Sequence, residues 1–262
     1  MNDSKKRSIE CVLFAAALSL AAYPSAAAQG GPPMITDDPF TVGANNWEIN
    51  LLPAMEHTKG STLYEMPNVD MNYGVGYRIQ LKFEVPWVVR KDAGVGAESG
   101  LGNAGIGMRY RFIDESRHGF AMSTYPAFEF SGTSSSVRRG VAEPTRSFFV
   151  PVEIAKTVNG VGVNGEVGYL FEQGGEGSWE YGLLFGRNAS EKVELLGELH
   201  ESVDKGFAAN EFLINLGSRI GMTDHVTLLV SAGRTLHGVG SPTTIASLGL
   251  QLNFMNTPER RQ

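Results

Sequence analysis

The chain has 262 residues and a formal net charge of −6 at pH 7. This acidic balance argues against nucleic acid as a partner, because nucleic-acid-binding domains carry clustered Lys and Arg. The sequence contains no run of 18 apolar residues, which excludes a transmembrane helix. The single cysteine, Cys11, lies at the start of an N-terminal apolar run, too early for a lipoprotein anchor. We therefore expect neither disulfides nor thiol chemistry in the mature protein.

Residues 1–28 are typical of a secretory signal peptide. Positive residues at 5–7 precede an apolar run over 12–22, which is too short to span a bilayer as a helix. The alanines at 26–28 predict cleavage before Gln29. An uncleaved anchor is the alternative, which the short run disfavours. Cleavage would leave about 234 residues, enough for one large β domain.

Residues 29–45 are rich in Pro, Gly and Asp and show no hydrophobic period. We expect this segment either to lie at the periplasmic mouth of the following domain or to plug its interior. Two adjacent acids could also suggest calcium, but further oxygen ligands at a suitable spacing are missing, so no metal site is predicted. The candidate residues of this mouth or plug are Thr36, Asp37, Asp38 and Pro39.

From Trp47 to Phe254 the chain repeats one pattern, with an apolar residue at every second position and then a turn. A strand sends successive side chains to opposite faces, so each segment has one apolar face and one polar face. The pattern predicts twelve strands, at residues 46–56, 63–73, 77–89, 103–113, 119–130, 146–156, 161–172, 178–187, 191–200, 210–220, 225–234 and 243–254.

The predicted connections alternate in length. Those after even-numbered strands are tight, as at 74–76 and 157–160, whereas those after odd-numbered strands are mostly longer and more polar, as at 90–102 and 131–145. Short turns at one rim and long loops at the other are typical of outer-membrane barrels. An even number of strands puts both chain ends on the periplasmic side.

The two rows of each predicted strand differ in charge. Apolar rows, such as the one from Ile79 to Trp87, hold no charged residue. A lipid-facing Arg or Lys at mid-depth costs about 2–4 kcal/mol, so this sorting predicts an all-β fold: a closed transmembrane up-and-down antiparallel barrel of about 12 strands. The lumen-facing candidates are Glu48, Lys82, Glu84, Arg109, Arg111, Glu153, Glu166, Glu180, Glu194, Glu198, Arg219 and Arg234.

These inward charges have mixed signs and leave two interpretations open. Opposite charges can pair across a narrow lumen and fill it, or they can line a pore that selects solutes. The inward rows show no ladder of a single sign, so no preference for anions or cations is predicted.

Two features fit the strand pattern less well. Residues 191–201 also suit an amphipathic helix, although Gly197 and the neighbouring strands favour a strand. Proline lacks the donor that a sheet ladder needs, so prolines inside predicted strands should mark bulges or early strand ends. These prolines are Pro53, Pro67, Pro86, Pro126 and Pro151.

The sequence contains no clear catalytic constellation, and we predict neither an enzyme nor a cofactor. His200 is the one strand histidine that could act as a base, and Ser202 lies two residues away, a spacing common by chance. The Gly-rich stretch 94–107 lacks the strand-to-helix context of a nucleotide site. An outer-membrane lipid-modifying enzyme centred on His200 is the least favoured alternative.

The expected mature chain resembles a known family. Residues 32–39 (PPMITDDP), followed by 47–50 (WEIN), are similar to the opening of outer-membrane β-barrel transporters described as "MetA-pathway of phenol degradation". Residues 73–81 (YGVGYRIQL) resemble that family's second periplasmic hairpin, residues 100–112 its fourth strand and residues 221–224 (GMTD) its recurrent turn. The resemblance implies a barrel fold, an outer-membrane location and a transport role. It implies no established substrate-binding residues.

These observations divide the chain into a signal peptide (1–28), a plug or mouth segment (29–45), a barrel (46–254) and a tail (255–262). Many outer-membrane barrels end on an aromatic residue, so with this tail the assembly signal around Phe254 would be internal. The expected partners are outer-membrane lipids, the barrel-assembly machinery and a solute that the sequence does not identify, and no oligomeric state is predicted.

We expect a passive outer-membrane channel for small solutes, with apolar or aromatic ones as candidates. The first alternative is a non-conducting structural or adhesive barrel whose long loops carry the function. A soluble periplasmic sandwich is the remaining structural alternative.

Overall fold

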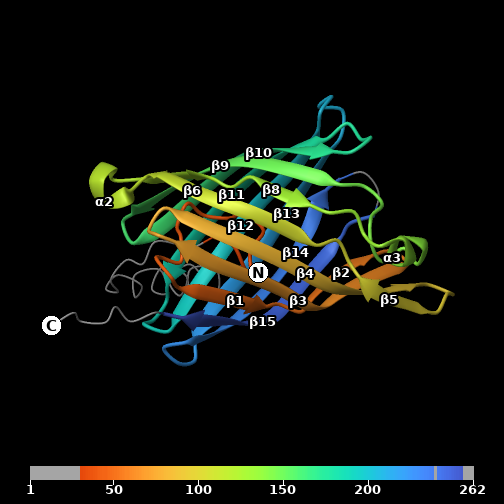
Figure 1. Ribbon diagram of the computed structural model, residues 1–262, viewed down its shortest axis with the longest axis horizontal. Helices are drawn as coiled ribbons and strands as arrows, with labels where there is room; N and C mark the ends of the chain where they lie inside the picture. Colours follow the sequence, from red (N-terminus) through yellow and green to blue (C-terminus); the bar gives the residue numbers. More distant parts are fainter. Residues whose placement is uncertain (1–29, 239–240, 256–262) are drawn as a thin grey trace, which may run out of the picture.

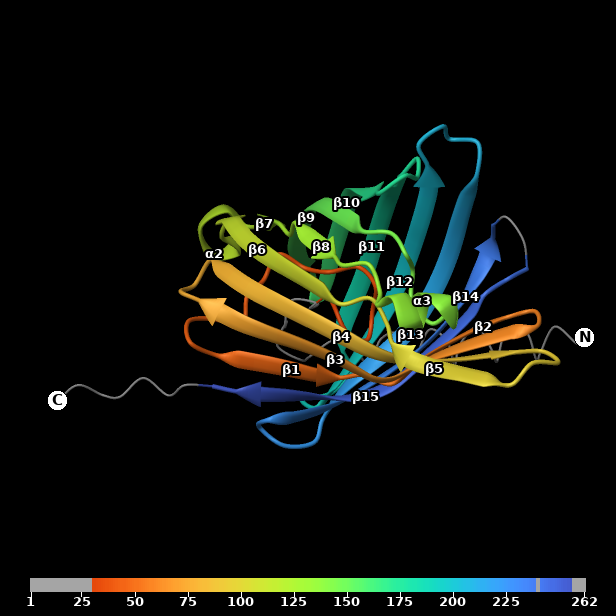
Figure 2. The same ribbon diagram turned by 45° about the vertical axis from the view of Figure 1, so that its right-hand side comes forward.

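The structure is a computed structural model that describes residues 30–238 and 241–255. The predicted signal peptide and most of the predicted tail lie outside these residues. The described strands form one antiparallel sheet that closes on itself (Figures 1 and 2). Both β1 (Trp47–Leu51) and β2 (Ala54–Thr58) pair with β15 (Thr244–Phe254), which joins the first strand to the last.

Fifteen strand segments make twelve spanning strands, because three of the twelve are each interrupted once. The interrupted strands are β1 with β2, β5 (Ala97–Leu101) with β6 (Gly105–Ile113), and β7 (Ala121–Thr124) with β8 (Ala127–Glu129). The others are β3 (Ser61–Val75), β4 (Ile79–Asp92), β9 (Ser147–Val158), β10 (Val161–Glu172), β11 (Ser178–Asn188), β12 (Val193–Asp204), β13 (Asn210–Gly221), β14 (Val226–His237) and β15. The predicted twelve-stranded antiparallel barrel is confirmed.

Prolines lie at half of the irregular points in the sheet, because their nitrogen cannot donate to the ladder. Pro53 separates β1 from β2, Pro126 separates β7 from β8, and Pro67 lies in a register shift between β3 and β4. Pro86 lies within β4, between the part that pairs with β6 and the part that pairs with β5. Pro151 lies within β9, between the part that pairs with β8 and the part that pairs with β7. The expected bulges and strand ends are confirmed at Pro53, Pro67 and Pro126. The expectation is wrong at Pro86 and Pro151, which lie inside continuous strands.

The turns after β3, β9, β11 and β13 lie at one end of the barrel, which we call the turn end, and the opposite end is the loop end. The connection 130–146 at the loop end contains α3 (Ser134–Arg138), and α2 (Glu115–His118) lies in the connection from β6 to β7. No helix among the described residues is long and apolar enough to cross a membrane.

Some strand boundaries differ from the prediction. The segment 191–201, with its helical alternative, belongs to strand β12. The long loop expected over 90–102 is wrong, because β4 continues to Asp92 and pairs with β5, which leaves only residues 93–96 as the connection. Where both faces of a strand meet water, the alternation of apolar and polar residues disappears although the ladder continues.

The outward rows form a band of exposed apolar side chains. On β9 the row contains Phe148, Val150, Val152 and Ile154, all exposed. Leu216, at the middle of β13, is 64% exposed. A continuous apolar band around a closed sheet is the surface that lipid covers in a transmembrane barrel.

Aromatic rings contact one another at both edges of this band. At the turn end the ring centroids of Trp47 and Tyr73 lie 4.7 Å apart. At the loop end Tyr169 lies 5.0 Å from Trp179 and 4.7 Å from Phe171. Such clusters suit the two membrane interfaces, where an amphipathic ring meets both lipid and water.

One inward assignment is wrong. Arg234 pairs across the sheet with Ile214 and Thr244 and shares the outward row of Val230 and Ala232. The physical reason is the two-residue period, because a residue that follows Ala232 by two positions must face the same side. Arg234 lies near the loop end of β14, where its long side chain can reach water.

We predict that Leu216→Arg destabilises the barrel in lipid bilayers by about 2–4 kcal/mol, because it places a charge at mid-depth in hydrocarbon. Ile220→Arg is the matched control on the same outward row, close to the turn end, where the cost falls to about 0–1 kcal/mol. Equilibrium unfolding by denaturant in vesicles measures both. Equal costs at the two positions would contradict the proposed lipid-facing band.

Candidate functional site

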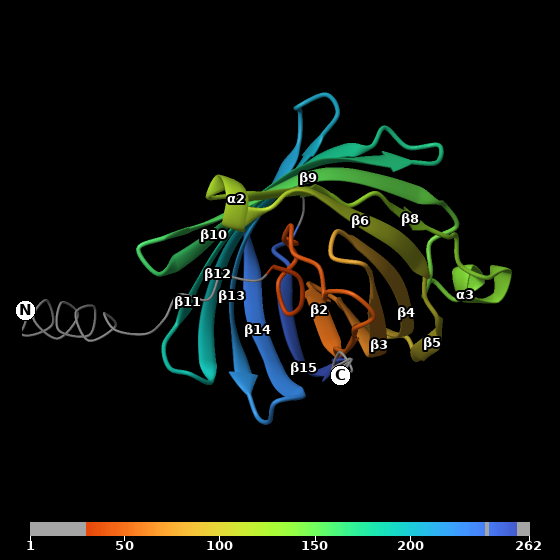
Figure 3. The same ribbon diagram turned by 60° about the vertical axis from the view of Figure 1, so that its left-hand side comes forward.

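The N-terminal residues 30–42 lie inside the ring of strands, and we call them the plug (Figure 3). Met34, Thr36 and Asp38 are buried there. Prolines at 32, 33 and 39 lack amide donors, so this segment is poorly suited to add a strand to a sheet. Its remaining backbone groups are left for side chains of the barrel wall. Thr36, Asp37, Asp38 and Pro39 all lie within this plug.

Arg219 on β13 binds the start of the plug. Its guanidinium donates hydrogen bonds to the carbonyl oxygens of Gly30, Gly31 and Pro32 over 2.8–3.1 Å. Nη1 of Arg219 also lies 3.2 Å from a carboxylate oxygen of Glu194 on β12. A guanidinium has five N–H donors in a fixed fork, so one side chain can hold several carbonyls and a carboxylate together.

Glu198 on β12 binds the middle of the plug. Its carboxylate accepts hydrogen bonds from the backbone N–H groups of Ile35 and Thr36 and from the Asn215 side chain on β13. Glu198 is only 1% exposed. A buried carboxylate is tolerated when several donors satisfy it, so the plug backbone and this wall residue stabilise each other.

Arg109 on β6 binds the end of the plug. It lies 2.5 Å from the carboxylate of Asp37 and donates a hydrogen bond of 2.7 Å to the carbonyl of Phe40. On the wall side its Nε lies 3.4 Å from Glu153, which also accepts from Ser123. Arg109 therefore connects the plug to a buried carboxylate of β9, and plug and wall share one charge network.

Lys82 on β4 lies beside this network. Its Nζ is 3.5 Å from Asp70 on β3, and it stands 5.6 Å from the centre of the Tyr125 ring. The Arg109 guanidinium lies 5.1 Å from the same ring. Tyr125 thus projects into the lumen between two cations, from the point where β7 and β8 separate.

Two wall glycines make room for plug side chains. At Gly182 on β11 an added Cβ would overlap the side chain of Thr36, and at Gly217 on β13 it would overlap Met34. Met34 also packs against Leu184 and Leu196, which are buried on the lumen side of the wall. The plug is therefore bound by side-chain packing against the wall as well as by hydrogen bonds.

The plug divides the lumen into two cavities. The turn-end cavity has a volume of about 610 Å³ and the loop-end cavity about 460 Å³. Between them a smaller space of about 70 Å³ lies beside the plug, lined by residues of β1, β3 and β4. This narrow space shares Glu48, Arg219 and Gln251 with the turn-end cavity and Lys82 with the loop-end cavity. It has room for roughly two water molecules.

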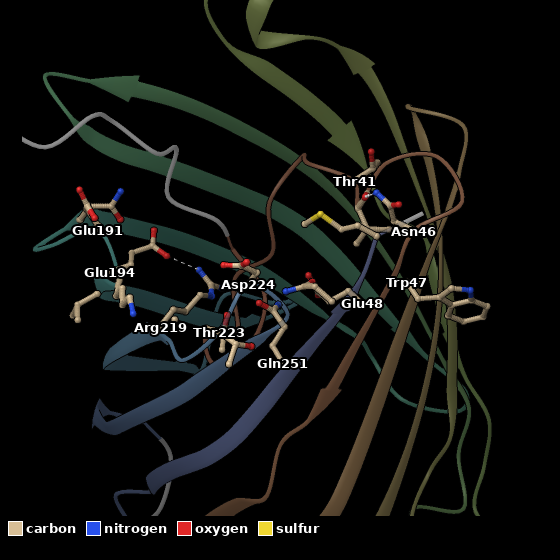
Figure 4. Close-up of a pocket in the computed structure, with 18 residues that line it drawn as sticks. Thr41, Asn46, Trp47, Glu48, Glu191, Glu194, Arg219, Thr223, Asp224 and Gln251 are labelled. Atoms are coloured by element: carbon tan, nitrogen blue, oxygen red, sulfur yellow. Dashed lines mark hydrogen bonds and ion pairs between the residues drawn. The ribbon is translucent and has the colours of Figure 1, made fainter. Parts of the chain in front are cut away.

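Figure 4 shows the turn-end cavity. Glu194 and Arg219 point toward one another, and Glu48 and Gln251 project from the neighbouring strands. The cavity wall is mostly polar at this end, with Asp224 in the turn after β13. Water can therefore fill this space while the plug stays in place.

The other predicted lumen residues fall into groups. Glu84 and Glu166 line the loop-end cavity together with Lys82, and Glu180 lies there too. Arg111 differs from the rest, because it binds the carbonyl of Tyr77 and the carboxylate of Asp114 near the turn-end rim.

Sequence reasoning missed several members of the site, most of them neutral. Gly182, Gly217, Asn215 and the acidic Asp70 occupy inward rows, so the alternation could have placed them in the lumen but not beside the plug. Tyr125 could not be found in this way, because it lies in an interruption of the strand, where the two-residue period fails.

The lipid-modifying alternative lacks the geometry of a nucleophile. Ser202 donates its hydrogen bond to Glu180 at 2.9 Å, and His200 lies 3.9 Å from the same carboxylate. An activated serine would give its proton to the histidine, which is not how these two groups are arranged. Among residues 30–238 and 241–255, no three His, Cys, Asp or Glu side chains gather closely enough to hold a metal ion.

Solved structures share this fold. An outer-membrane channel from Pseudomonas putida F1 superposes with a TM-score of 0.68 at 12% identity, over 86% of this chain and 100% of that one. The KdgM porin, solved with oligogalacturonate, gives 0.56 at 12% identity over 79% and 99% of the two chains. The translocator domain of the autotransporter NalP from Neisseria meningitidis gives 0.52 at 8% identity over 96% and 97%.

No protein-family model and no curated protein sequence matches the chain. The identities to the solved structures are low, so these likenesses establish the fold, that of outer-membrane β-barrels. They do not decide which of these proteins' functions the chain shares.

We predict that Gly182→Val displaces the plug from the wall, because the new side chain fills the space of Thr36. The measurement is the rate at which a water-soluble maleimide labels Thr36→Cys, with and without Gly182→Val. In the Thr36→Cys variant labelling should be slow, since Thr36 is fully buried. In the double variant it should be at least about tenfold faster, which corresponds to a change of about 1.4 kcal/mol in the free energy of exposing this position. Gly165→Val on the outward row of β10 is the matched control and should leave the rate unchanged.

Proposed function

We propose that this protein is a passive outer-membrane channel for small solutes, with its turn end facing the periplasm. The observation that carries the proposal is the pair of lumen cavities with a narrow space between them beside the plug. A barrel built only for structure would gain nothing from two open cavities on either side of a bound segment. Both ends of the barrel domain lie at the turn end, which suits a chain delivered from the periplasm.

The plug sets the conductance in this proposal. With the plug bound, the passage admits water and small ions, and larger solutes must wait until the plug moves. Hydrogen bonds to charged groups contribute about 1.5–3 kcal/mol each, and Arg219, Glu198 and Arg109 each make several. The plug is therefore bound in most molecules, and its release is the step that admits a solute.

The solute class also belongs to the proposal. Ile35 and Leu170 give the loop-end cavity an apolar side, which supports small apolar or aromatic solutes as candidates. The resemblance of residues 32–39 to the opening of the "MetA-pathway of phenol degradation" transporters supports the same class. The fold shared with a Pseudomonas putida channel and the KdgM porin is compatible with passive transport.

Conductance in planar bilayers tests the proposal. The full mature chain should give small single-channel currents, and deletion of residues 30–40 should give larger ones, because the passage of about 70 Å³ then merges with both cavities. Wall residues such as Arg219 and Glu198 would then be solvated by water in the widened lumen. Deletion of residues 134–139, which removes α3 at the loop end, is the control and should leave the current unchanged.

The folded state of each variant is checked by heat-modifiable mobility in gels. A folded barrel that passes neither ions nor solutes, with and without residues 30–40, would overturn the channel proposal. Equal currents from the full chain and the deletion would show that the plug does not limit transport.

A further inference from the structure

The loop-end cavity has an apolar strip between two acidic sides. Going round the barrel, Glu84 on β4 and Glu129 on β8 come first, followed by Phe149 on β9 and Leu170 on β10. Glu180 on β11 follows them, so carboxylates flank the strip on both sides. The arrangement depends on the strand order and could not be seen in any single strand.

The floor of the cavity also carries apolar groups, beside the paired Asp37 and Lys82. Ile35 projects from the plug into this space and is 48% exposed, although it belongs to a segment that is otherwise largely buried. The Tyr125 ring lies on the same floor. An exposed isoleucine inside a cavity is a surface that an apolar ligand would cover, because removing apolar area from water is favourable.

The cations near this cavity are already paired. Lys82 lies 3.5 Å from Asp70, which is outside the cavity wall, and Arg109 is bound by Asp37 and Glu153. These ion pairs remove most of the attraction that an anionic ligand would experience. An anion would also face the carboxylates described above, and His200, the remaining basic side chain of the cavity wall, lies 3.9 Å from Glu180.

Three carboxylates of the cavity, in contrast, have mostly neutral partners, whereas Asp37, which also lines it, is paired with Arg109. Glu129 accepts from the Asn103 side chain at 2.9 Å, and Glu180 accepts from the hydroxyl groups of Ser178 and Ser202. Glu84 accepts from Asn68 at 2.9 Å, and its distance to Lys82 Nζ is 4.0 Å. Neutral donors orient a carboxylate but leave its negative charge, so this cavity attracts positive charge.

We propose that the loop-end cavity is a binding site for organic cations with an apolar body, such as aromatic or alkyl amines. The cationic group would lie near Glu129 or Glu180, and the apolar body would lie on the strip of Phe149 and Leu170 and against Ile35. The role of this site in uptake rests on the proposed channel function, because it would select the solute before the plug is displaced.

Binding by the full mature protein in detergent, measured by isothermal titration calorimetry with protein-free micelles as the blank, tests the inference. The probes are benzyltrimethylammonium, which has both features, tetramethylammonium, which lacks the apolar body, and benzenesulfonate, which has the opposite charge. We expect benzyltrimethylammonium to bind at least about tenfold more tightly than either of the others, a difference of about 1.4 kcal/mol.

Isosteric variants locate the site. Glu129→Gln and Glu180→Gln should each weaken benzyltrimethylammonium binding by about threefold to tenfold, as expected for one partly exposed charge. Glu201→Gln is the matched control, because Glu201 also accepts from an asparagine, Asn210, but lies on the outward row of β12. Ile35→Ser should weaken binding of benzyltrimethylammonium and leave that of tetramethylammonium unchanged.

Equal affinity for benzenesulfonate and benzyltrimethylammonium would overturn the inference, and so would unchanged binding in both glutamine variants that retain folded-barrel gel mobility. The titration does not require conduction, so the two proposals can fail separately. A barrel that conducts but shows no preference for the cation would contradict only the proposed binding site. A barrel that binds the cation but passes no current would contradict only the proposed channel.

Discussion

Hydrocarbon offers no hydrogen-bond partner to a peptide group, and the architecture of this protein depends on that constraint. A sheet that crosses a bilayer must pair its first strand with its last, as β1 and β2 do with β15. Closure then sorts the side chains, because one row of every strand must face lipid and the other must face an enclosed space. The breaks near Pro53 and Pro126 are tolerated since the strands on both sides keep their ladders.

The enclosed space imposes a second constraint, because charged side chains that are cut off from bulk water still need hydrogen-bond and ion-pair partners. In the narrow middle of the barrel the plug provides these partners. Its backbone carbonyls and amides complete the hydrogen bonds of Arg219 and Glu198, and Asp37 neutralises Arg109. The wall in turn satisfies a segment that could not form regular structure by itself. While the plug is bound, each part satisfies polar groups of the other that bulk water does not reach.

The two interpretations of the inward charges, a lumen filled by ion pairs and an open pore, therefore apply at different depths along the axis of the same barrel. In the middle, opposite charges pair and leave a space of about 70 Å³, whereas cavities of about 610 and 460 Å³ remain at the two ends. The mixed signs of the inward residues do not show this arrangement, because the list of residues does not tell that the arginines and Lys82 form ion pairs. Carboxylates such as Glu129 keep neutral partners at the loop end, and the electrostatic character of the cavity follows from that difference.

The alternation of apolar and polar residues determined the barrel, the number of its strands and the inward direction of residues such as Glu198, because a strand has a fixed period of two. Pro53 and Pro126 also predicted two strand ends, and Pro67 predicted a bulge. Sequence could not show where the plug binds, since Gly182 and Gly217 make room only for a segment more than 140 positions away in the chain. It could not show which inward charges are neutralised either, because pairing depends on distances across the lumen. Only the closed sheet brings the carboxylates of β4, β8 and β11 round one cavity. The tertiary structure therefore decided the negative character of the loop-end cavity, on which its proposed preference for cations rests.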